Sequence, residues 1–286
     1  MKHLNTYITE YIVKKKLDKP INSENNYKYF PETKEELIAN IKELLNKGET
    51  NLNCIDTSNI TDMSHLFRAL KVSTNIDVSN WNVSNVKDMK GMFYNYENFN
   101  CDLSKWAVSN VKYMESMFFN CKNFDRDLSN WDVSKVDNIS NMFSMCKIFT
   151  GKGLDKWDVS NVENMMHMFT SCPKFEGKVL ENWNVSNVKN MQYMFYNCKE
   201  LNCNLSKWNM HNVTDINYMF YNCIKFEGKG LEKWNVSNVK NMCCTFFDCA
   251  NFNCNLNKWD VSNVTKMHNL FDGCKLLTNT PTWYKK

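Results

Sequence analysis

The sequence predicts an α/β solenoid, in which short parallel strands and short helices from successive repeats stack on one another. The first indication is the spacing of tryptophan, which recurs every 25 or 26 residues at Trp81, Trp106, Trp131, Trp157, Trp183, Trp208, Trp234 and Trp259, with Trp283 following after 24. The second is that the residues around each tryptophan repeat with it. A fixed period of this length is typical of stacked structural units.

Each repeat combines two periodicities in the pattern L-x-x-W-x-V-S-N-V-x-x-M-x-x-M-F-x-x-C-x-x-F. From Trp106 to Val108 the apolar spacing is two residues, which predicts a short strand with both side chains on one face. From Val111 to Cys121 the apolar residues follow at steps of three, three, one and three. This second spacing predicts about two turns of helix.

Serine and asparagine separate the two halves of most repeats. The pair occurs at Ser84-Asn85, Ser109-Asn110, Ser160-Asn161, Ser186-Asn187, Ser237-Asn238 and Ser262-Asn263, and it departs at Lys135 and His211. Side chains of these types accept hydrogen bonds from the free N–H groups at helix starts. We therefore expect them to cap the short helix of each repeat.

Stacking is required because a lone strand and a two-turn helix cannot bury their apolar face. Parallel strands at about 4.8 Å spacing would place leucine, tryptophan, valine, methionine, phenylalanine and cysteine in interior columns, over about nine coils. Some repeats carry one extra residue before the leucine, as in 150–154 and 227–231, where two glycines occur. Glycine permits a turn with positive φ, so we expect the extra residue to bulge outward without breaking the register.

The repeat resembles known leucine-rich repeats. L-x-x-W-x-V-x-x-V has the spacing of their strand motif, and M-F-x-x-C-x-x-F is similar to the helical part of BspA-like bacterial repeats. The string W-D-V-S-N-V at 157–162 and 259–264 resembles the BspA-like leucine-rich repeat surface protein family most strongly. The resemblance covers about residues 51–283 and implies a leucine-rich-repeat-like, curved solenoid used for adhesion or protein binding. It brings no catalytic motif to this chain.

The first fifty residues lie outside the repeat, so we divide the chain into an N-terminal helical segment and cap, 1–50, and a solenoid, 51–286. Leu4, Tyr7, Ile8, Tyr11 and Ile12 follow helical spacing, ahead of three lysines at 14–16. Such a helix would pack on its own domain, or it would dock on a membrane surface or a partner. A second helix is predicted between a capping box at 33–36 and a glycine stop at 48, with an apolar face suited to cover the raw end of the solenoid.

Charge and hydropathy limit the function classes. The 35 basic and 31 acidic residues leave a net charge of only +4, which does not favour nucleic acid as a partner. No stretch of about 18 apolar residues predicts a transmembrane segment. The first residues lack the pattern of a secretory signal, which predicts an intracellular location, whereas the family resemblance implies the cell surface.

The thirteen cysteines predict no cofactor or metal site. Seven of them occupy one column of the repeat, at Cys121, Cys146, Cys172, Cys198, Cys223, Cys249 and Cys274, where we expect small buried thiols. Disulfides between coils would have poor geometry, and no C-x-x-C pair suggests zinc. The five histidines fall at different positions of the repeat, and no Gly-rich phosphate loop or catalytic motif occurs. The sequence therefore predicts that the protein is not an enzyme.

Two surfaces are candidates for partner binding. The first is the stripe that flanks the tryptophans, whose lysines are Lys105, Lys156, Lys207, Lys233 and Lys258. It would bind an acidic polymer or protein, or it would simply keep the strand face soluble.

The second is a tyrosine patch. Tyr193 and Tyr196 recur one repeat later as Tyr218 and Tyr221, so stacking should gather four rings in one exposed patch. Alternatively, the rings merely cover neighbouring coils. Together these observations predict a non-catalytic module that binds a protein or another macromolecule, without a cofactor. The alternative is a structural spacer or assembly component with no specific ligand, and the sequence does not define an oligomeric state.

Overall fold

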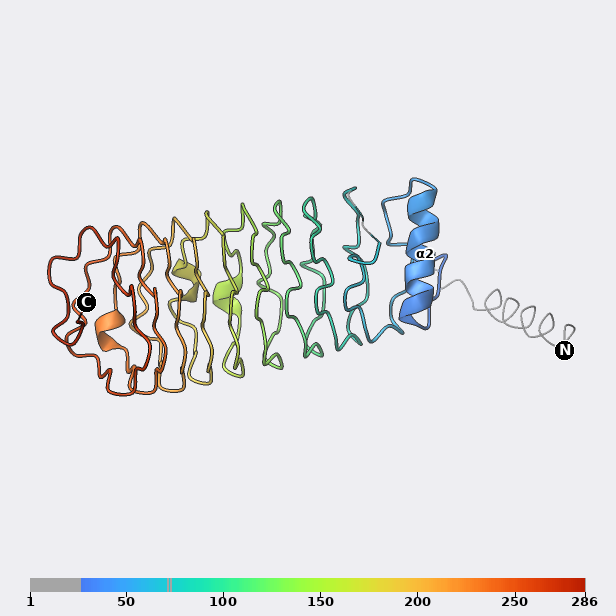
Figure 1. Ribbon diagram of the computed structural model, residues 1–286. Coiled ribbons are helices and arrows are strands. Elements are labelled where there is room, and N and C mark those ends of the chain that lie inside the picture. Colours follow the sequence, from blue (N-terminus) through green and yellow to red (C-terminus); the bar gives the residue numbers. More distant parts are fainter. Residues whose placement is uncertain (1–26, 71, 73, 286) are drawn as a thin grey trace, which may run out of the picture.

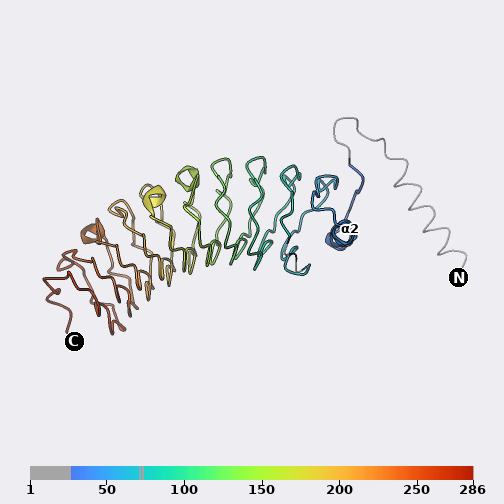
Figure 2. The ribbon, with the colours of Figure 1, turned by 90° about the horizontal axis from the view of Figure 1, so that it is seen from above.

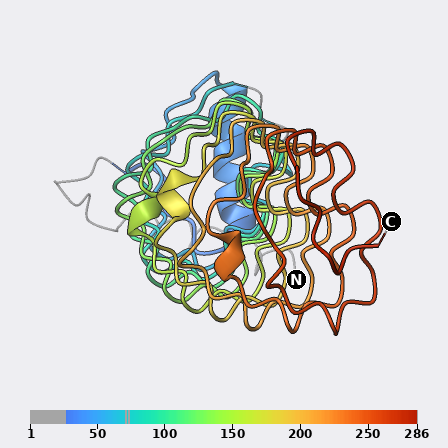
Figure 3. The same cartoon turned by 90° about the vertical axis from the view of Figure 1, so that its left-hand side faces the viewer.

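Successive repeats lie on one another in register and form a curved stack of coils, with one helix across its N-terminal end (Figure 1). The computed structural model describes residues 27–70, 72 and 74–285. Its helical elements are α2 (Lys34–Asn46) and three single 3₁₀ turns, η1 (Leu154–Lys156), η2 (Lys178–Leu180) and η3 (Leu231–Lys233). Seen along the stack, the coils enclose one shared interior, and α2 lies behind them (Figure 3). The helix predicted around residues 4–12 falls outside the described residues.

Neighbouring coils are joined in parallel. Isolated parallel bridges link equivalent residues from Asp62 through Asp88, Tyr113, Asn138, Asn164, Asn190, Asp215 and Asn241 to Lys266. The parallel pairing follows from the repeat, because a period of 25 or 26 residues returns each residue to the position above its equivalent. The strands predicted from the tryptophan to the valine, as at 106–108, are wrong: within the described part of the chain these residues make no bridge, and the bridges that recur along the stack are single residues just before the first methionine or isoleucine.

The segment from valine to cysteine in each repeat is not the short helix that its apolar spacing predicts. N–H groups at alternate positions donate to carbonyl groups of the next coil at 2.7–3.0 Å, as at Met165, His167, Phe169 and Ser171. Most N–H groups between them donate three residues back, as from Met168 to Met165 at 3.2 Å, whereas the Met166 N–H donates to Oδ1 of Asn164 at 3.0 Å. An α-helix would direct every N–H four residues back within its own coil. Consecutive turns replace the helix because half of its donors serve the neighbouring coil.

Left-handed backbone makes this alternation possible. We call the segment from the second valine to the cysteine of each repeat the turn segment. Positive φ recurs in it from Gly91 onward, at the second and sixth residues after its first methionine or isoleucine. Ser116 and Asn120 are one such pair, both with φ of 57°. Asparagine and glycine tolerate this region best, and asparagine fills it repeatedly.

The serine and asparagine between the repeat halves hold turns rather than helix starts. The Ser134 N–H donates to Oδ1 of Asp132 at 3.0 Å, and Nδ2 of Asn161 donates to the Ser134 carbonyl one coil back at 2.7 Å. The same two bonds recur along the stack. The predicted caps are therefore wrong, since no helix follows. The motif instead closes a local turn and ties it to the preceding coil.

The interior consists of columns of identical side chains. Trp131 is buried between Trp106 and Trp157, with ring centroids 6.5 and 6.3 Å away and planes within 2° of parallel. Its indole N–H donates to the carbonyl of Leu103 in the preceding repeat at 3.2 Å. A phenylalanine column runs beside the indoles, as in Phe118 and Phe143 with centroids 5.6 Å apart. Each indole therefore buries a large apolar surface without leaving its N–H unsatisfied.

The cysteine column supplies a second kind of satisfied interior group. The Cys146 thiol donates to the Phe118 carbonyl one coil back at 3.1 Å, and the equivalent bond recurs at Cys172 and Cys198. All thirteen cysteines lie in the described residues, and all are free thiols. Burial raises the pKa of the Cys172 thiol to about 12, so this thiol stays protonated and unreactive at neutral pH.

The stack is curved because its columns are spaced unequally. Outside the core run further aromatic columns, which contain the pairs Tyr94–Phe119, His167–Tyr193 and Tyr221–Phe247. Neighbouring rings lie 4.5–4.8 Å apart in these outer columns, 5.3–5.9 Å in the phenylalanine column, and 6.3–6.5 Å among the indoles. The coils therefore fan apart toward the tryptophans and close up on the opposite side. Figure 2 shows the same arc, with η1, η2 and η3 on the side where the coils are wide apart. The outer aromatic columns accordingly line the concave face.

Helix α2 caps the N-terminal end as predicted. The Thr33 hydroxyl accepts the Glu36 N–H at 3.2 Å, and Gly48 ends the helix with φ of 80°. Leu37, Ile41 and Leu44 are buried against the first coil. The segment before the helix also joins the stack, because Tyr29 makes a parallel bridge with Ile55.

The extra residues before some leucines are accommodated by glycine, as expected. Gly151 and Gly153 have φ of 87° and 85°, and Gly228 and Gly230 repeat this geometry three repeats later in the stack. A Cβ atom on Gly153 would collide with the backbone nitrogen of Ser129 in the preceding coil. The 3₁₀ turns η1 and η3 follow directly from these glycines.

Replacing Trp157 with alanine should cost about 3–5 kcal/mol of unfolding free energy, because the cavity would open between two stacked indoles. Urea unfolding followed by circular dichroism measures the change. Trp283→Ala is the matched control: this indole is only partly buried and has an indole neighbour on one side, Trp259, so the loss should be smaller. A loss below about 1 kcal/mol at Trp157 would contradict its interior position.

Ser171, with φ of 58°, tests the left-handed backbone. Ser171→Gly should preserve or raise stability, whereas Ser171→Val should be less stable than the glycine variant by about 1–2 kcal/mol. Thermal unfolding midpoints report the order. At exposed Lys174, which is outside the left-handed set, the order of the glycine and valine variants should reverse. The same order at both positions would refute the role assigned to this backbone.

Candidate functional site

Four tyrosines gather on the concave face. Tyr193 stacks on Tyr218 and Tyr196 stacks on Tyr221, each pair with ring centroids 4.7 Å apart, and tilted contacts of 5.6–6.5 Å join the two columns. The proximity predicted from the repeat is therefore observed, although the rings are half-buried rather than fully exposed. The ring faces cover one another, so the edges and hydroxyl groups are what the surface presents.

The aromatic columns extend beyond the tyrosines. His167 stacks on Tyr193 at 4.5 Å, and Phe247 stacks on Tyr221 at 4.8 Å. A second aromatic run lies nearer the cap, where Arg68 sits 4.6 Å above the Tyr94 ring and Phe119 stacks on Tyr94 at 4.5 Å. Sequence reasoning missed these residues because they are not tyrosines, apart from Tyr94, which has no tyrosine at the equivalent position of the next coil. Their identical register in the repeat was the available signal.

The concave face also differs from repeat to repeat. We define it by the first, second and fifth residues after the first methionine or isoleucine of the turn segment. The first column reads Ser64, Lys90, Glu115, Ser140, Met166, Gln192, Asn217, Cys243, His268. The second reads His65, Gly91, Ser116, Asn141, His167, Tyr193, Tyr218, Cys244, Asn269. The fifth reads Arg68, Tyr94, Phe119, Ser144, Thr170, Tyr196, Tyr221, Phe247, Asp272.

The backbone of the second column is strained at its bulky residues. Tyr193 has φ of 57°, Tyr218 has φ of 55°, and His167 has φ of 59°. Large side chains are uncommon in this region of backbone space, which costs about 1–2 kcal/mol per residue outside glycine. Strain of this kind is concentrated at functional sites in proteins generally.

Four polar atoms buried on or beside the concave face have no hydrogen-bond partner among the described residues: His65 Nδ1, Glu115 Oε2, Asn120 Oδ1 and Asn217 Oδ1. Burial is the main cause that lowers the pKa of His65, so its imidazole is neutral at pH 7. Three of the four atoms are oxygens that accept hydrogen bonds. Water or a partner with N–H groups would satisfy them.

A pair of cysteines interrupts the columns at the far end of the tyrosines. The Cys243 sulfur lies 3.1 Å from His268 Nδ1, across adjacent coils. The hydrogen bond between Cys244 and Tyr218 is the first cause that raises the pKa of Tyr218 to about 12. Burial raises the pKa of Cys243, so the thiol is protonated at neutral pH and is not an activated nucleophile.

The stripe beside the tryptophans is largely occupied by structural bonds. The five candidate lysines, Lys105, Lys156, Lys207, Lys233 and Lys258, are exposed and lie at equivalent places of their coils. Lys105 and Lys207 donate to Asn80 and Asn182 of the preceding coils, at 2.8 and 2.6 Å. The acidic and amide residues that follow the tryptophans close the Asx turns described above. Much of this stripe therefore serves the coil itself.

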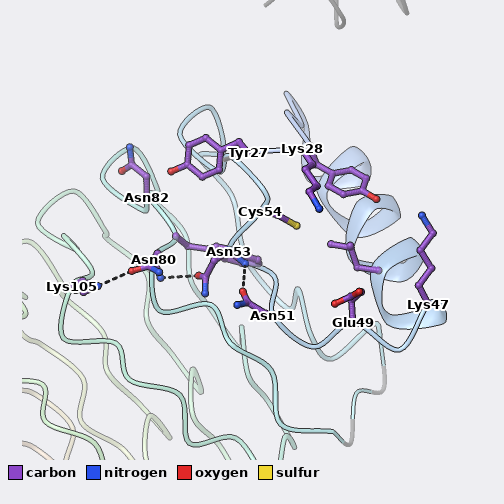
Figure 4. Close-up of a pocket in the computed structure, with 13 residues that line it drawn as sticks. Tyr27, Lys28, Lys47, Glu49, Asn51, Asn53, Cys54, Asn80, Asn82 and Lys105 are labelled. Carbon is purple, nitrogen blue, oxygen red and sulfur yellow. Dashed lines mark hydrogen bonds between the residues drawn. The ribbon is translucent and has the colours of Figure 1, made fainter. Parts of the chain in front are cut away.

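A polar pocket of about 1320 Å³, which we call the cap pocket, lies where α2, residues 27–29 and the first coils meet (Figure 4). It is lined by Tyr27, Lys28, Tyr29, Leu44, Lys47, Glu49, Asn51, Asn53, Cys54, Asn80, Trp81, Asn82 and Lys105. The repeat pattern does not predict this pocket, because one of its walls is formed by the non-repeating segment at 27–29.

The described part of the chain contains no group of three or more histidine, cysteine or acidic residues placed to hold a metal ion. In the same part of the chain, no helix has the length and apolar character needed to cross a bilayer.

Comparison with known proteins identifies one family. The family model described as "Mycoplasma protein of unknown function, DUF285" matches residues 36–152, 140–230 and 212–285. Among solved structures, the chain is similar to a leucine-rich repeat protein from Eubacterium ventriosum ATCC 27560, with 13% sequence identity and a TM-score of 0.26, over 87% of this chain and 89% of that chain. No curated protein matches the chain.

Asp215 on the edge of the concave face provides a pH test. Burial is the main cause that raises its pKa, so folding favours the protonated carboxyl and loses stability as the pH rises through the pKa of the folded state. Asp215→Asn, which matches Asn164, Asn190 and Asn241 in equivalent positions, should raise the thermal unfolding midpoint at pH 7.

The gain should vanish at a pH below the unfolded value of about 3.9. Asp260→Asn is a control for which the expected change in the unfolding midpoint has the opposite sign, because hydrogen bonds from Ser262 lower the pKa of Asp260. This variant should lower the midpoint at pH 7. A pH-independent effect at Asp215 would contradict the assignment.

Proposed function

The chain belongs to the family described as Mycoplasma protein of unknown function, DUF285, and we propose that it is a non-catalytic module that binds a protein partner through its concave face. The main support is the pair of aromatic columns built from Tyr193, Tyr196, Tyr218 and Tyr221 on that face. Tyrosine is enriched at interfaces because it combines a large contact area with a polar group and few rotatable bonds.

The distribution of sequence variation supports this choice of surface. The interior columns and the turns beside the tryptophans repeat nearly unchanged, as their structural roles require. The concave columns instead change from coil to coil and contain mainly tyrosine, serine, asparagine and other polar residues. This composition resembles that of antibody paratopes, and repeat proteins commonly use a concave surface for binding.

The strained backbone at Tyr193 and Tyr218 supports the same surface. Glycine or asparagine would fit these left-handed positions at lower cost, and asparagine does so at Asn141 and Asn269. A large side chain there is explained if its ring contributes to binding. The resemblance of W-D-V-S-N-V to BspA-like surface proteins adds adhesion at a cell surface to the proposal.

A structural spacer is the second candidate. The continuous columns of indole, phenylalanine and thiol side chains, with inter-coil bonds at every step, favour a stiff rod. Such a rod would hold other molecules apart without recognising a specific ligand. The experiment below separates the two functions.

Random peptides displayed on phage are selected against the full-length protein, and their affinities are measured by fluorescence anisotropy. Tyr196→Ser combined with Tyr221→Ser should weaken the selected peptides by about 2 kcal/mol or more, because two interface aromatics are removed. The fold should persist, since Ser144 and Thr170 occupy equivalent positions.

The matched control is Lys233→Asn with Lys258→Asn, because asparagine occurs at equivalent positions 80 and 130. This control should leave the affinities unchanged. Loss of affinity in the lysine variant alone would move the contact to the tryptophan side. Failure to select any peptide would favour the spacer.

A further inference from the structure

The cap pocket presents an excess of hydrogen-bond donors. Four asparagines form much of its floor, and each side-chain oxygen is already engaged within the protein. Oδ1 of Asn51 accepts the Asn53 N–H at 3.0 Å, and Oδ1 of Asn53 accepts the Asn80 N–H at 2.8 Å. Oδ1 of Asn80 accepts the Lys105 ammonium at 2.8 Å, and Oδ1 of Asn82 accepts the Ser84 N–H at 3.1 Å.

These partners fix the orientation of all four amides. A backbone N–H or a lysine ammonium can only donate, so each asparagine must turn its oxygen toward it. Each NH₂ group is then the free end of its amide. Among the described residues, none of these four NH₂ groups donates a hydrogen bond.

Positive charge adds to this donor excess. Lys28, Lys47 and Lys105 line the pocket, whereas Glu49 is the one carboxylate among its lining residues. The Lys47 ammonium bonds Glu43 at 2.6 Å, and Lys105 bonds Asn80, so each retains further N–H groups. A ligand that is rich in acceptors and negatively charged matches this surface.

The size of the pocket and its aromatic lining narrow the ligand further. A volume of about 1320 Å³ extends over successive coils, from Asn51 through Asn82 to Lys105, and exceeds the volume of a single small anion. Tyr27 and Tyr29 are half-buried at its wall, where an apolar ring face could pack. An acidic peptide fits less well, because its backbone N–H groups can only donate and would add to the donor excess of this floor.

We propose that the cap pocket binds an acidic oligosaccharide. Its carboxylates would accept hydrogen bonds from the lysines and amide NH₂ groups, its hydroxyl groups would both accept and donate, and its ring faces would pack on the tyrosines. This site is separate from the concave face, so the proposal does not depend on the protein-binding function proposed for that face.

The test is isothermal titration calorimetry of the full-length protein with a galacturonic acid tetrasaccharide at physiological salt. The variant combines Asn51→Asp with Asn82→Asp. Aspartate keeps the oxygen that holds each turn and replaces the donor NH₂ with a second acceptor. Aspartate already occupies equivalent positions at Asp102 and Asp132, where it makes the same turn bond, so the fold should be retained.

The matched control combines Asn204→Asp with Asn184→Asp, which make the same turn bonds in distant coils and the same change of charge. The tetrasaccharide should bind the wild type and the control equally, and the pocket variant at least about tenfold more weakly. Neutral galactose tetrasaccharide and a hexaglutamate peptide should bind much more weakly than the acidic sugar. No binding of the acidic sugar, equal binding to both variants, or equal binding of hexaglutamate would overturn the proposal.

Discussion

The alternation of hydrogen bonds in the turn segment is the constraint on which the structure depends. Because N–H groups at every second position bond the next coil, neighbouring coils are locked in register along this edge. The lock sets the close spacing of the outer aromatic columns, and the bulky indoles on the other side force the coils apart. Curvature, the concave face and the stacking of its tyrosines all follow from these two spacings. The left-handed residues, such as Asn120, are the local condition for the pattern.

The stack itself was predictable from the sequence because the period and the apolar columns depend only on which residues recur. The cap helix was predictable for a different reason: Thr33, Glu36 and Gly48 act through local backbone bonds that do not need the rest of the fold. The consecutive turns that replace the predicted two-turn helix were missed. Steps of three and four residues bring Met114, Met117 and Cys121 inward equally well in a helix and in consecutive turns. The repeated asparagine at left-handed positions distinguished the two, since a helix interior gives it no advantage.

The candidate sites also differ in how far the sequence predicted them. The quartet of tyrosines could be assembled from the repeat, because residues one period apart must be neighbours. The contacts of His167, Phe247 and the Cys243–His268 pair follow the same register but join unlike residues, which a search for repeated types overlooks. The cap pocket depends on how residues 27–29 return to the first coil, which no repeat specifies. Binding candidates of this kind arise where the periodic pattern is broken.

The inter-coil bonds also give the molecule a direction. Between the coils of Ile139 and Met165, four turn-segment N–H groups of the earlier coil donate to the later one, and two N–H groups return to the carbonyl of Asp137. Each peptide unit has a dipole of about 3.5 D, so a net excess of aligned units adds along the axis. Along the turn segment, one face of a coil therefore offers mainly backbone donors and the opposite face mainly backbone acceptors, whereas the indole, thiol and asparagine donors point the other way. Such an array can be extended by duplication of repeats within a gene or by contact between molecules. In both cases the added coil must have the same direction as the coil below it, because the backbone donors of one coil have to meet the acceptors of the next.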